Sequence, residues 1–404
     1  MRGSRWIGVL AAGVLLAACG SDPGGRDGAS SGSATPPASG SVVVGCPAGS
    51  VPDQPGDPAQ GRPALRDWYL LAAMEPAGTG IVVVETGLDT WTFDACINTW
   101  TEVGDPSPPA HEKRPALDQL VTHPGAGVVL GIPTWWTPVW SYDPGAGSWT
   151  SIASSGGGSE AWPNAVYDPD RDHLLAFDPN VLVSAAVVDD PGATGVLAYD
   201  VDQRAWTELK SAEPQETLPQ VLMDSYDLAY DTAARRLILV ITPGPTGKPG
   251  RTWRFDSVER TWSPGADIPD TLPNGYPSTG WATAFDPVTE RTWLFADTAM
   301  LGYDASADDW VVAERDADWP ASMALGDEAV DPTARVVSTM VLDPVNDRLV
   351  VIGGQVRPDG QPPGGWLSEN ALLPTDDVWA YQPATNTWTM LLAPSQNPAS
   401  YGPG

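Results

Sequence analysis

The acidic and histidine side chains are the first candidates for catalysis or metal binding in this sequence. Residues 168–172 read Asp-Pro-Asp-Arg-Asp, which spaces three carboxylates as at the start of a calcium loop, but the glycine and distal glutamate of the helical calcium-binding loop are missing. His111, His123 and His173 show no ligand spacing, and no phosphate loop, nucleophile elbow or zinc motif is present. We therefore expect no metal and no other cofactor.

Tryptophan is the residue type best suited to binding a ligand here. The chain has 19 tryptophans, and the candidates for binding lie outside the repeated phrase described below. An exposed indole offers flat apolar surface and one N–H donor, which suits a sugar ring or an extended peptide. The candidate ligand-binding residues are Trp135, Trp136, Trp162, Trp281, Trp319 and Trp366.

One phrase occurs six times along the chain, and the elements that it forms must position these side chains. Each copy has an aromatic residue, usually followed by Asp, then about five mostly polar residues and a terminal Trp. Successive terminal Trp residues are 49, 57, 56, 48 and 78 positions apart. A period of roughly 50 residues is typical of repeated supersecondary units. The terminal residues, which we expect in the core, are Trp100, Trp149, Trp206, Trp262, Trp310 and Trp388.

Each repeat predicts four antiparallel strands. The phrase itself indicates a hairpin, because alternating aromatic and polar residues make a half-buried strand and Asp with small residues makes the bend. A second hairpin precedes it, as in residues 165–168 before 173–175. Blades of four strands arranged radially protect their edges. We therefore expect an all-β, six-bladed β-propeller over residues 65–392. Residues 329–332, in the longest interval, are expected in a loop, and half of a degenerate blade is the alternative.

The sixth copy resembles a kelch repeat. Residues 348–354 read Arg-Leu-Val-Val-Ile-Gly-Gly, and residues 377–391 contain Trp-Ala-Tyr followed by the terminal Trp388. The paired glycines are absent from the other copies, and Gln382 replaces the turn Asp in this one. The resemblance implies a kelch-like (galactose-oxidase-type) propeller, a fold that carries many unrelated activities. In the rival quinoprotein type, Thr-Gly-Lys precedes the Trp, and none of the six terminal Trp residues follows that triplet.

The resemblance also indicates what an enzyme on this fold would need. The copper radical oxidase of this propeller type needs a Cys cross-linked to Tyr and ligand histidines, and neither Cys46 nor Cys96 has such a context. Glycoside hydrolysis needs two carboxylates at a defined separation, and 51 acidic residues do not single out a pair. We favour a binding protein, and an extracytoplasmic oxidase or carbohydrate-active enzyme is the alternative.

A propeller would bring the candidate Trp residues to one side. They lie in segments that lead into the innermost strands or join the second strand to the third. In a propeller, these two classes of connection emerge on one face, beside the channel. We expect the ligand to bind there, and the alternative is that some of these side chains only fill the channel or an insertion.

Residues 1–18 form a separate element. Arg2 and Arg5 precede an apolar stretch, residues 6–18, which is typical of an export signal. The stretch is too short to span a bilayer comfortably, and a retained helix is the alternative. Leu16-Ala17-Ala18-Cys19 resembles the signal of bacterial lipoproteins, which implies cleavage before Cys19 and acylation of its thiol. An exported protein without lipid is the alternative. Because several acyl chains anchor a protein stably, we expect localisation at the extracytoplasmic face of the cell membrane.

The segments around the propeller have the composition of linkers. Residues 19–64 are rich in Gly, Ser and Pro, which predicts a flexible tether after the acylated Cys19, and residues 393–404 predict a disordered tail. Once Cys19 is acylated, Cys46 and Cys96 remain, a pair that would oxidise in an exported protein. This disulfide would attach the tether to the first blade, and two free thiols or a metal site are the alternatives.

The charge of the chain limits its partners. The sequence has 21 basic and 51 acidic residues, and removal of Arg2 and Arg5 with the leader leaves 19 basic residues and a net charge of −32. A surface this acidic repels phosphate backbones, so we exclude nucleic acid as a partner. The expected partners are a protein or glycan outside the membrane, and the lipid bilayer through Cys19.

Overall fold

The computed structural model describes most of the chain after residue 44. The described residues are 45–63, 70–85, 89–104, 110–111, 114–115, 117–133, 138–156, 164–188, 190–215, 226–241, 250–269, 282–296, 299–314, 323–325, 328–336, 339–358 and 373–395. They belong to one compact unit, Ser41–Gly404. The predicted leader and Cys19 lie outside the described residues.

Six antiparallel sheets form the blades, and in each blade four strands follow one another along the chain. Blades one to three consist of β1 (Leu70–Met74), β2 (Gly80–Glu85), β3 (Thr90–Asp94), β4 (Thr99–Val103); β7 (Gln119–His123), β8 (Val128–Ile132), β9 (Val139–Asp143), β10 (Ser148–Ile152); and β11 (Asn164–Asp168), β12 (His173–Phe177), β13 (Val196–Asp200), β14 (Ala205–Glu208). Blades four to six consist of β15 (Tyr226–Asp231), β16 (Arg236–Ile241), β17 (Arg251–Asp256), β18 (Thr261–Pro264); β19 (Ala282–Asp286), β20 (Arg291–Ala296), β21 (Ala299–Asp304), β22 (Asp309–Val312); and β25 (Thr339–Asp343), β26 (Arg348–Pro358), β27 (Leu373–Gln382), β28 (Thr387–Leu392).

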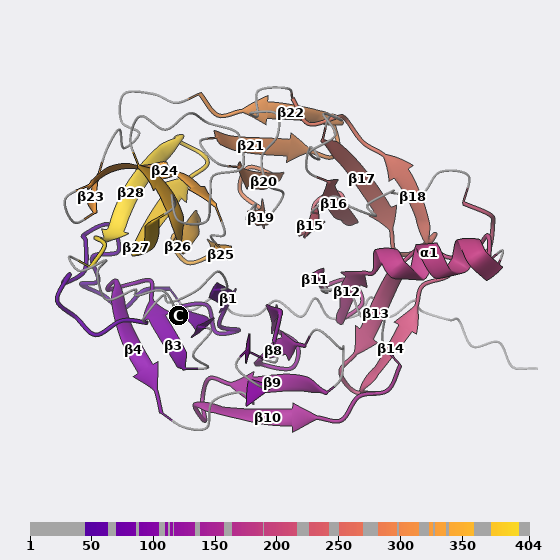
Figure 1. Ribbon diagram of the computed structural model, residues 1–404, viewed down its shortest axis with the longest axis horizontal. Coiled ribbons are helices and arrows are strands. Elements are labelled where there is room, and N and C mark those ends of the chain that lie inside the picture. Colours follow the sequence, from indigo (N-terminus) through magenta and orange to yellow (C-terminus); the bar gives the residue numbers. More distant parts are fainter. Residues whose placement is uncertain are drawn as a thin grey trace, which may run out of the picture. The chain divides into compact units, whose positions relative to one another are not determined.

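The blades stand in a ring around a central axis (Figure 1). The innermost strands β1, β7, β11, β15, β19 and β25 each contact the next in this order, and β25 contacts β1. Apolar side chains fill the space between neighbouring blades; for example, Ile238 and Val240 of blade four share a core with Leu301 and Tyr303 of blade five. The predicted six-bladed, all-β propeller is therefore confirmed.

Local turn chemistry explains why Asp recurs at strand ends. The Asp200 carboxylate, at the end of β13, accepts the backbone N–H of Gln203 at 2.8 Å, and Arg204 closes the turn in the left-handed conformation with φ of 55°. This combination makes a short hairpin turn. The same left-handed position recurs at Asn98, Asp172, Arg235, Arg260, Glu290, Asp308, Asp347 and Asn386. We call the end of the ring with these turns the turn face, and the opposite end, where the inner strands begin, the connection face.

Each terminal Trp contacts its own hairpin and the preceding blade. Across the six outer hairpins, the ring centroids of the repeat aromatic and the terminal Trp are 5.0–5.2 Å apart. In blade one, Trp100 shares a core with Val350 and Ile352 of blade six, which completes the ring. None of the six is more than 9% exposed. The repeated Trp is therefore the residue that joins one blade to the next.

Two strands extend blade six where the sequence predicts a loop. β23 (Met323–Leu325) and β24 (Glu328–Val336) form a hairpin, and β24 pairs with the later part of β26. The prediction of a loop at residues 329–332 is wrong, because these residues belong to β24. β26 passes through an irregularity at Gly353 and Gly354, both with positive φ, and continues to Pro358. The continued strand offers β24 an edge to pair with.

Two smaller elements lie in connections between strands. β5 (Ala110–His111) and β6 (Arg114–Pro115) form a short hairpin, and α1 (Pro179–Val188) follows β12. α1 begins after Asp178, whose carboxylate accepts the backbone N–H of Asn180 at 2.9 Å as a helix cap does. In the part of the chain that the structure describes, no helix has the length and apolarity needed to cross a membrane.

The segment before β1 is held against the propeller. Residues 45–63 fall within the predicted tether, but Cys46 forms a disulfide with Cys96 and the Gly56 N–H donates to the Leu391 carbonyl of β28 at 2.7 Å. The predicted disulfide is confirmed. The tether prediction does not hold for residues 45–63, because their backbone groups find partners on the blades.

Candidate functional site

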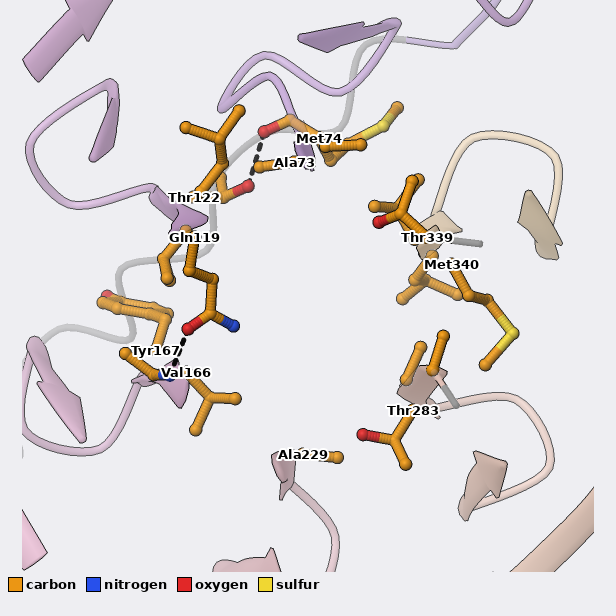
Figure 2. Close-up of a pocket in the computed structure, with 18 of the residues that line it drawn as sticks. Ala73, Met74, Gln119, Thr122, Val166, Tyr167, Ala229, Thr283, Thr339 and Met340 are labelled. Carbon is orange, nitrogen blue, oxygen red and sulfur yellow. Dashed lines mark hydrogen bonds between the residues drawn. The ribbon is translucent and has the colours of Figure 1, made fainter. Parts of the chain in front are cut away.

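The six innermost strands enclose a cavity around the axis of the ring (Figure 2). Its volume is about 510 Å³, and residues of β1, β7, β11, β15, β19 and β25 line it. Cavities of this size accept a small ligand or a side chain of a larger one. The cavity is therefore the candidate binding site within the described residues.

Polar side chains lie at the connection face of this cavity, and we call them the polar collar. The collar consists of Gln119, Asn164, Asp227, Thr283 and Thr339. Gln119 Oε1 accepts the backbone N–H of Ala165 on the next blade, and its Nε2 points into the cavity (Figure 2). Asn164 Nδ2 likewise donates to the Tyr226 carbonyl of the next blade at 2.8 Å. These contacts fix Gln119 and Asn164, and the Gln119 Nε2 donor remains directed at the cavity.

Asp227 is the ionisable member of the collar. Its carboxylate accepts the backbone N–H of Leu228 at 2.9 Å, the N–H of Thr283 at 2.6 Å and the hydroxyl of Thr283 at 3.0 Å. Burial raises the pKa of Asp227 to about 6, and these hydrogen bonds offset the rise only in part. Asp227 therefore accepts three donors from the wall in a fixed orientation.

The charged side chains along the described wall are all acidic. They are Glu75, Asp118 and Asp227, and the wall includes no Lys, Arg or His within the described residues. Burial, and then the nearby Asp94, raise the pKa of Glu75. The rest of the wall is neutral, with small apolar side chains such as Val166 and Ala229 in its middle. Such a wall disfavours anions and accepts neutral groups.

The three carboxylates of residues 168–172 point to separate partners at the turn face. Asp168 accepts the backbone N–H of Asp170 at 2.9 Å within the turn. Asp170 accepts the hydroxyl of Tyr230 at 2.8 Å, and Asp172 accepts that of Tyr167 at 2.7 Å. Within the described ranges, no group of three or more His, Cys, Asp and Glu side chains could hold a metal ion.

The predicted binding tryptophans cannot be placed at the cavity. Trp135, Trp136, Trp162, Trp281, Trp319 and Trp366 all lie outside the described residues. Two described strands begin close to them in the sequence: β11 begins two residues after Trp162, and β19 begins one residue after Trp281. Both strands begin at the connection face. Their role in binding stays a prediction.

Sequence reasoning missed the polar collar, although the chain carries a signal for it. Gln119, Asn164, Asp227 and Thr339 each lie four residues before the residue that ends their inner strand, and Thr283 lies three before. Alignment of the inner strands on those terminal positions would have shown a polar position at the start of four blades. The repeated phrase lies in the outer hairpins, so it does not single out these inner-strand positions.

Comparisons with known proteins add little to this picture. No protein-family model matches the sequence, and no curated protein matches it significantly. Among solved structures, the chain is similar to one described as the crystal structure of a nidogen/laminin complex, with a TM-score of 0.39 and 11% sequence identity over 60% of this chain and 78% of that chain.

Proposed function

We propose that the chain is an extracytoplasmic lipoprotein whose kelch-like propeller binds a protein or glycan at the connection face. The observation that carries this proposal is the cavity of about 510 Å³ with its polar collar. The terminal Trp side chains of the repeats are buried between blades, so they do not contact a ligand. The polar collar takes no part in this packing between blades, and its side chains line the cavity on the axis.

The chemistry of the cavity supports a neutral ligand group. Amide and hydroxyl groups at Gln119, Asn164 and Thr339 suit the hydroxyls of a sugar or the backbone of an extended peptide. The acidic wall opposes phosphate and carboxylate groups. Trp162 and Trp281, which closely precede β11 and β19 in the sequence, would supply the flat apolar contact that such ligands need.

Binding can be tested with an array of cell-wall glycans and secreted proteins, followed by titration of the intrinsic Trp fluorescence. We expect a ligand to quench this fluorescence, and Trp136→Ala and Trp162→Ala to weaken binding by about 2 kcal/mol or more, as central aromatic anchors do. Val288, which is 54% exposed in a turn at the other end of the ring, provides the matched control. Val288→Ala should bind as the unmodified protein does.

Three results would contradict this site. Normal affinity of both Trp variants would remove the connection face from consideration, and loss of affinity in Val288→Ala alone would move the site to the turn face. Chemical conversion of a glycan or alcohol on the array would favour the alternative, an extracytoplasmic oxidase or carbohydrate-active enzyme.

The anchor makes a separate prediction. Expressed with its own leader, the protein should partition into the detergent phase, because acyl chains on Cys19 would each contribute roughly 0.8 kcal/mol per buried methylene. Cys19→Ser should move it to the aqueous phase or block its processing, whereas Cys46→Ser, which keeps Cys19, should leave it in the detergent phase. Identical fractionation of the unmodified protein and Cys19→Ser in the aqueous phase would refute the lipoprotein assignment.

A further inference from the structure

One junction in the ring lacks a chain connection. Blades one to six follow each other along the sequence, so the chain passes directly between neighbours at five junctions. Blade six ends at Leu392 and blade one begins at Leu70, and no strand is shared between them. A chain segment that links two blades keeps them at a high effective concentration. Two blades without such a link therefore separate more easily. We call this junction the seam.

Residues 45–63, which we call the strap, are fixed to blade one. Cys46 is bonded to Cys96 in the turn between β3 and β4, 50 residues along the chain. In the same turn, Asn98 Nδ2 donates to the carbonyls of Pro52 and Gln54, each at 2.8 Å. The Gln60 side chain makes two further hydrogen bonds to the backbone of blade one. Its Nε2 donates to the Asn98 carbonyl at 3.1 Å, and its Oε1 accepts the Trp100 N–H at 2.8 Å.

The same strap also contacts blade six. The Gly56 N–H donates to the Leu391 carbonyl at 2.7 Å, and Arg62 donates to the Ala393 carbonyl at 2.7 Å. Arg62 also pairs with Asp376 at 3.3 Å, and both side chains are less than 10% exposed. The strap therefore bridges the two blades that the chain does not link in sequence.

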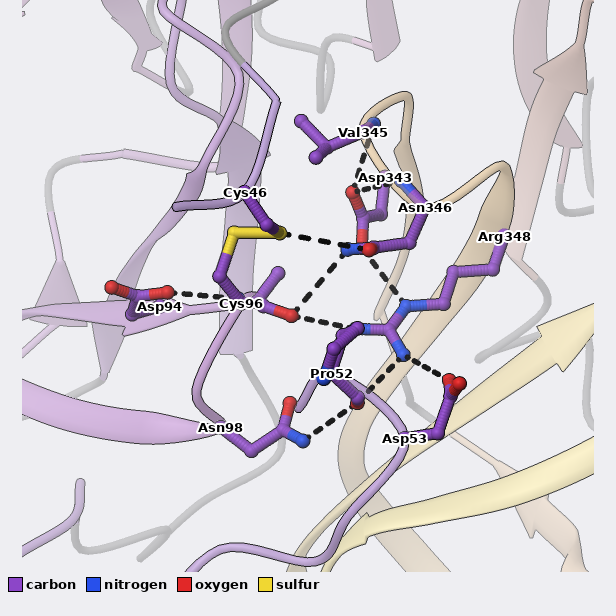
Figure 3. The surroundings of a disulfide bond; sticks show 11 residues. Cys46, Pro52, Asp53, Asp94, Cys96, Asn98, Asp343, Val345, Asn346 and Arg348 are labelled. Carbon is purple, nitrogen blue, oxygen red and sulfur yellow. Dashed lines mark hydrogen bonds and ion pairs between the residues drawn. A yellow bond between two sulfur atoms is a disulfide. The ribbon is translucent and has the colours of Figure 1, made fainter. Parts of the chain in front are cut away.

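Arg348 is the centre of this bridge (Figure 3). It lies at the start of β26 in blade six, with its side chain 2% exposed. Its guanidinium donates to Asp343 of its own blade at 2.9 Å, to the Ala95 carbonyl of blade one at 2.8 Å and to the Pro52 carbonyl of the strap at 3.0 Å. One buried cation thus holds blade six, blade one and the strap together.

We propose that the strap closes the propeller at the seam, and that the Cys46–Cys96 disulfide makes this closure dependent on oxidising conditions. The disulfide and the covalent path from Pro63 towards β1 fix both ends of the strap to blade one. While both ends are fixed, the strap stays beside its partners on blade six. Reduction to two thiols, with two electrons and two protons from an added dithiol that itself becomes a disulfide, frees the Cys46 end and lowers the effective concentration of the strap at the seam.

Hydrogen exchange on the oxidised mature protein tests the proposal. Reduction in the folded state should remove exchange protection from the strap and from amides on both sides of the seam, including Asn98, Trp100 and Arg348. Amides at the junction of blades three and four, such as Trp262, should keep their protection. Equal protection at the seam before and after reduction, or equal loss at all six junctions, would overturn the proposal.

A matched pair of glycines tests the strap without altering the cysteines. An added Cβ at Gly56 would lie 2.1 Å from the Asn98 carbonyl oxygen, whereas one at Gly61 would meet no atom within 4 Å. Gly56→Ala should therefore lose protection at the seam with the disulfide intact, and Gly61→Ala should not. Equal seam protection in the two variants would show that the strap does not close the ring.

Discussion

Replacement of Trp262 by alanine is expected to lower the free energy of unfolding by about 3–5 kcal/mol. The side chain is 7% exposed, and its ring centroid lies 5.0 Å from that of Phe255 in its own hairpin and 5.6 Å from that of Phe177 in blade three. Its indole N–H donates to the Thr194 carbonyl at 2.8 Å. Truncation would leave a cavity between blades three and four and a buried carbonyl without this donor.

Urea unfolding, compared at unchanged slope, measures this loss. Trp262→Phe keeps most of the ring contacts and loses the N–H, so we expect an intermediate loss. Val258, 65% exposed in the turn of the same hairpin, supplies the control, and Val258→Ala should stay within about 0.5 kcal/mol of the unmodified protein. A Trp262→Ala variant as stable as Val258→Ala would mean that the terminal Trp does not join the blades.

The blades could be predicted from the sequence because their determinants are local. Tyr199, Asp200 and Trp206 lie within eight residues, and these few positions specify the strand end, the turn and the cross-strand aromatic pair. The aromatic residue and the terminal Trp recur in all six copies and the turn Asp in five of them, so each copy still indicates the hairpin. The count of six then follows from the number of copies.

The strap and the extension of blade six could not be predicted, because their contacts join distant positions. Arg348 reaches the Ala95 carbonyl across 253 residues, and no local pattern around Arg348 indicates that partner. Residues 329–332 contain Asp-Pro, which locally indicates a turn, yet β24 pairs with the continued β26. The collar is intermediate: each of its residues has a regular position in a strand, but only ring closure brings those positions together.

Asp377 carries the second large expected effect. In blade six it forms a two-fold ion pair with Arg335, with both N–O distances 3.0 Å and the side chains 0% and 1% exposed. Its oxygens also accept the Thr375 hydroxyl at 2.8 Å and the Trp379 indole N–H at 2.6 Å. Asp377→Asn keeps the shape but replaces one acceptor by a donor, so it should lower the free energy of unfolding by about 3–5 kcal/mol, the loss that follows when a buried ion pair loses one partner.

Two comparisons separate this loss from an ordinary surface effect. Lys210 is 53% exposed in its ion pair with Asp190, and Lys210→Ala should change the stability far less than Asp377→Asn, because solvent screens an exposed ion pair. The double variant Arg335→Met/Asp377→Leu removes both charges and should be more stable than Asp377→Asn, because no cation is then left buried without its carboxylate. Chemical denaturation ranks the three variants. If the double variant were the least stable, the ion pair itself would hold the hairpin of β23 and β24 on blade six. If Asp377→Asn were as stable as Lys210→Ala, the Arg335 charge would have to reach solvent, contrary to its burial.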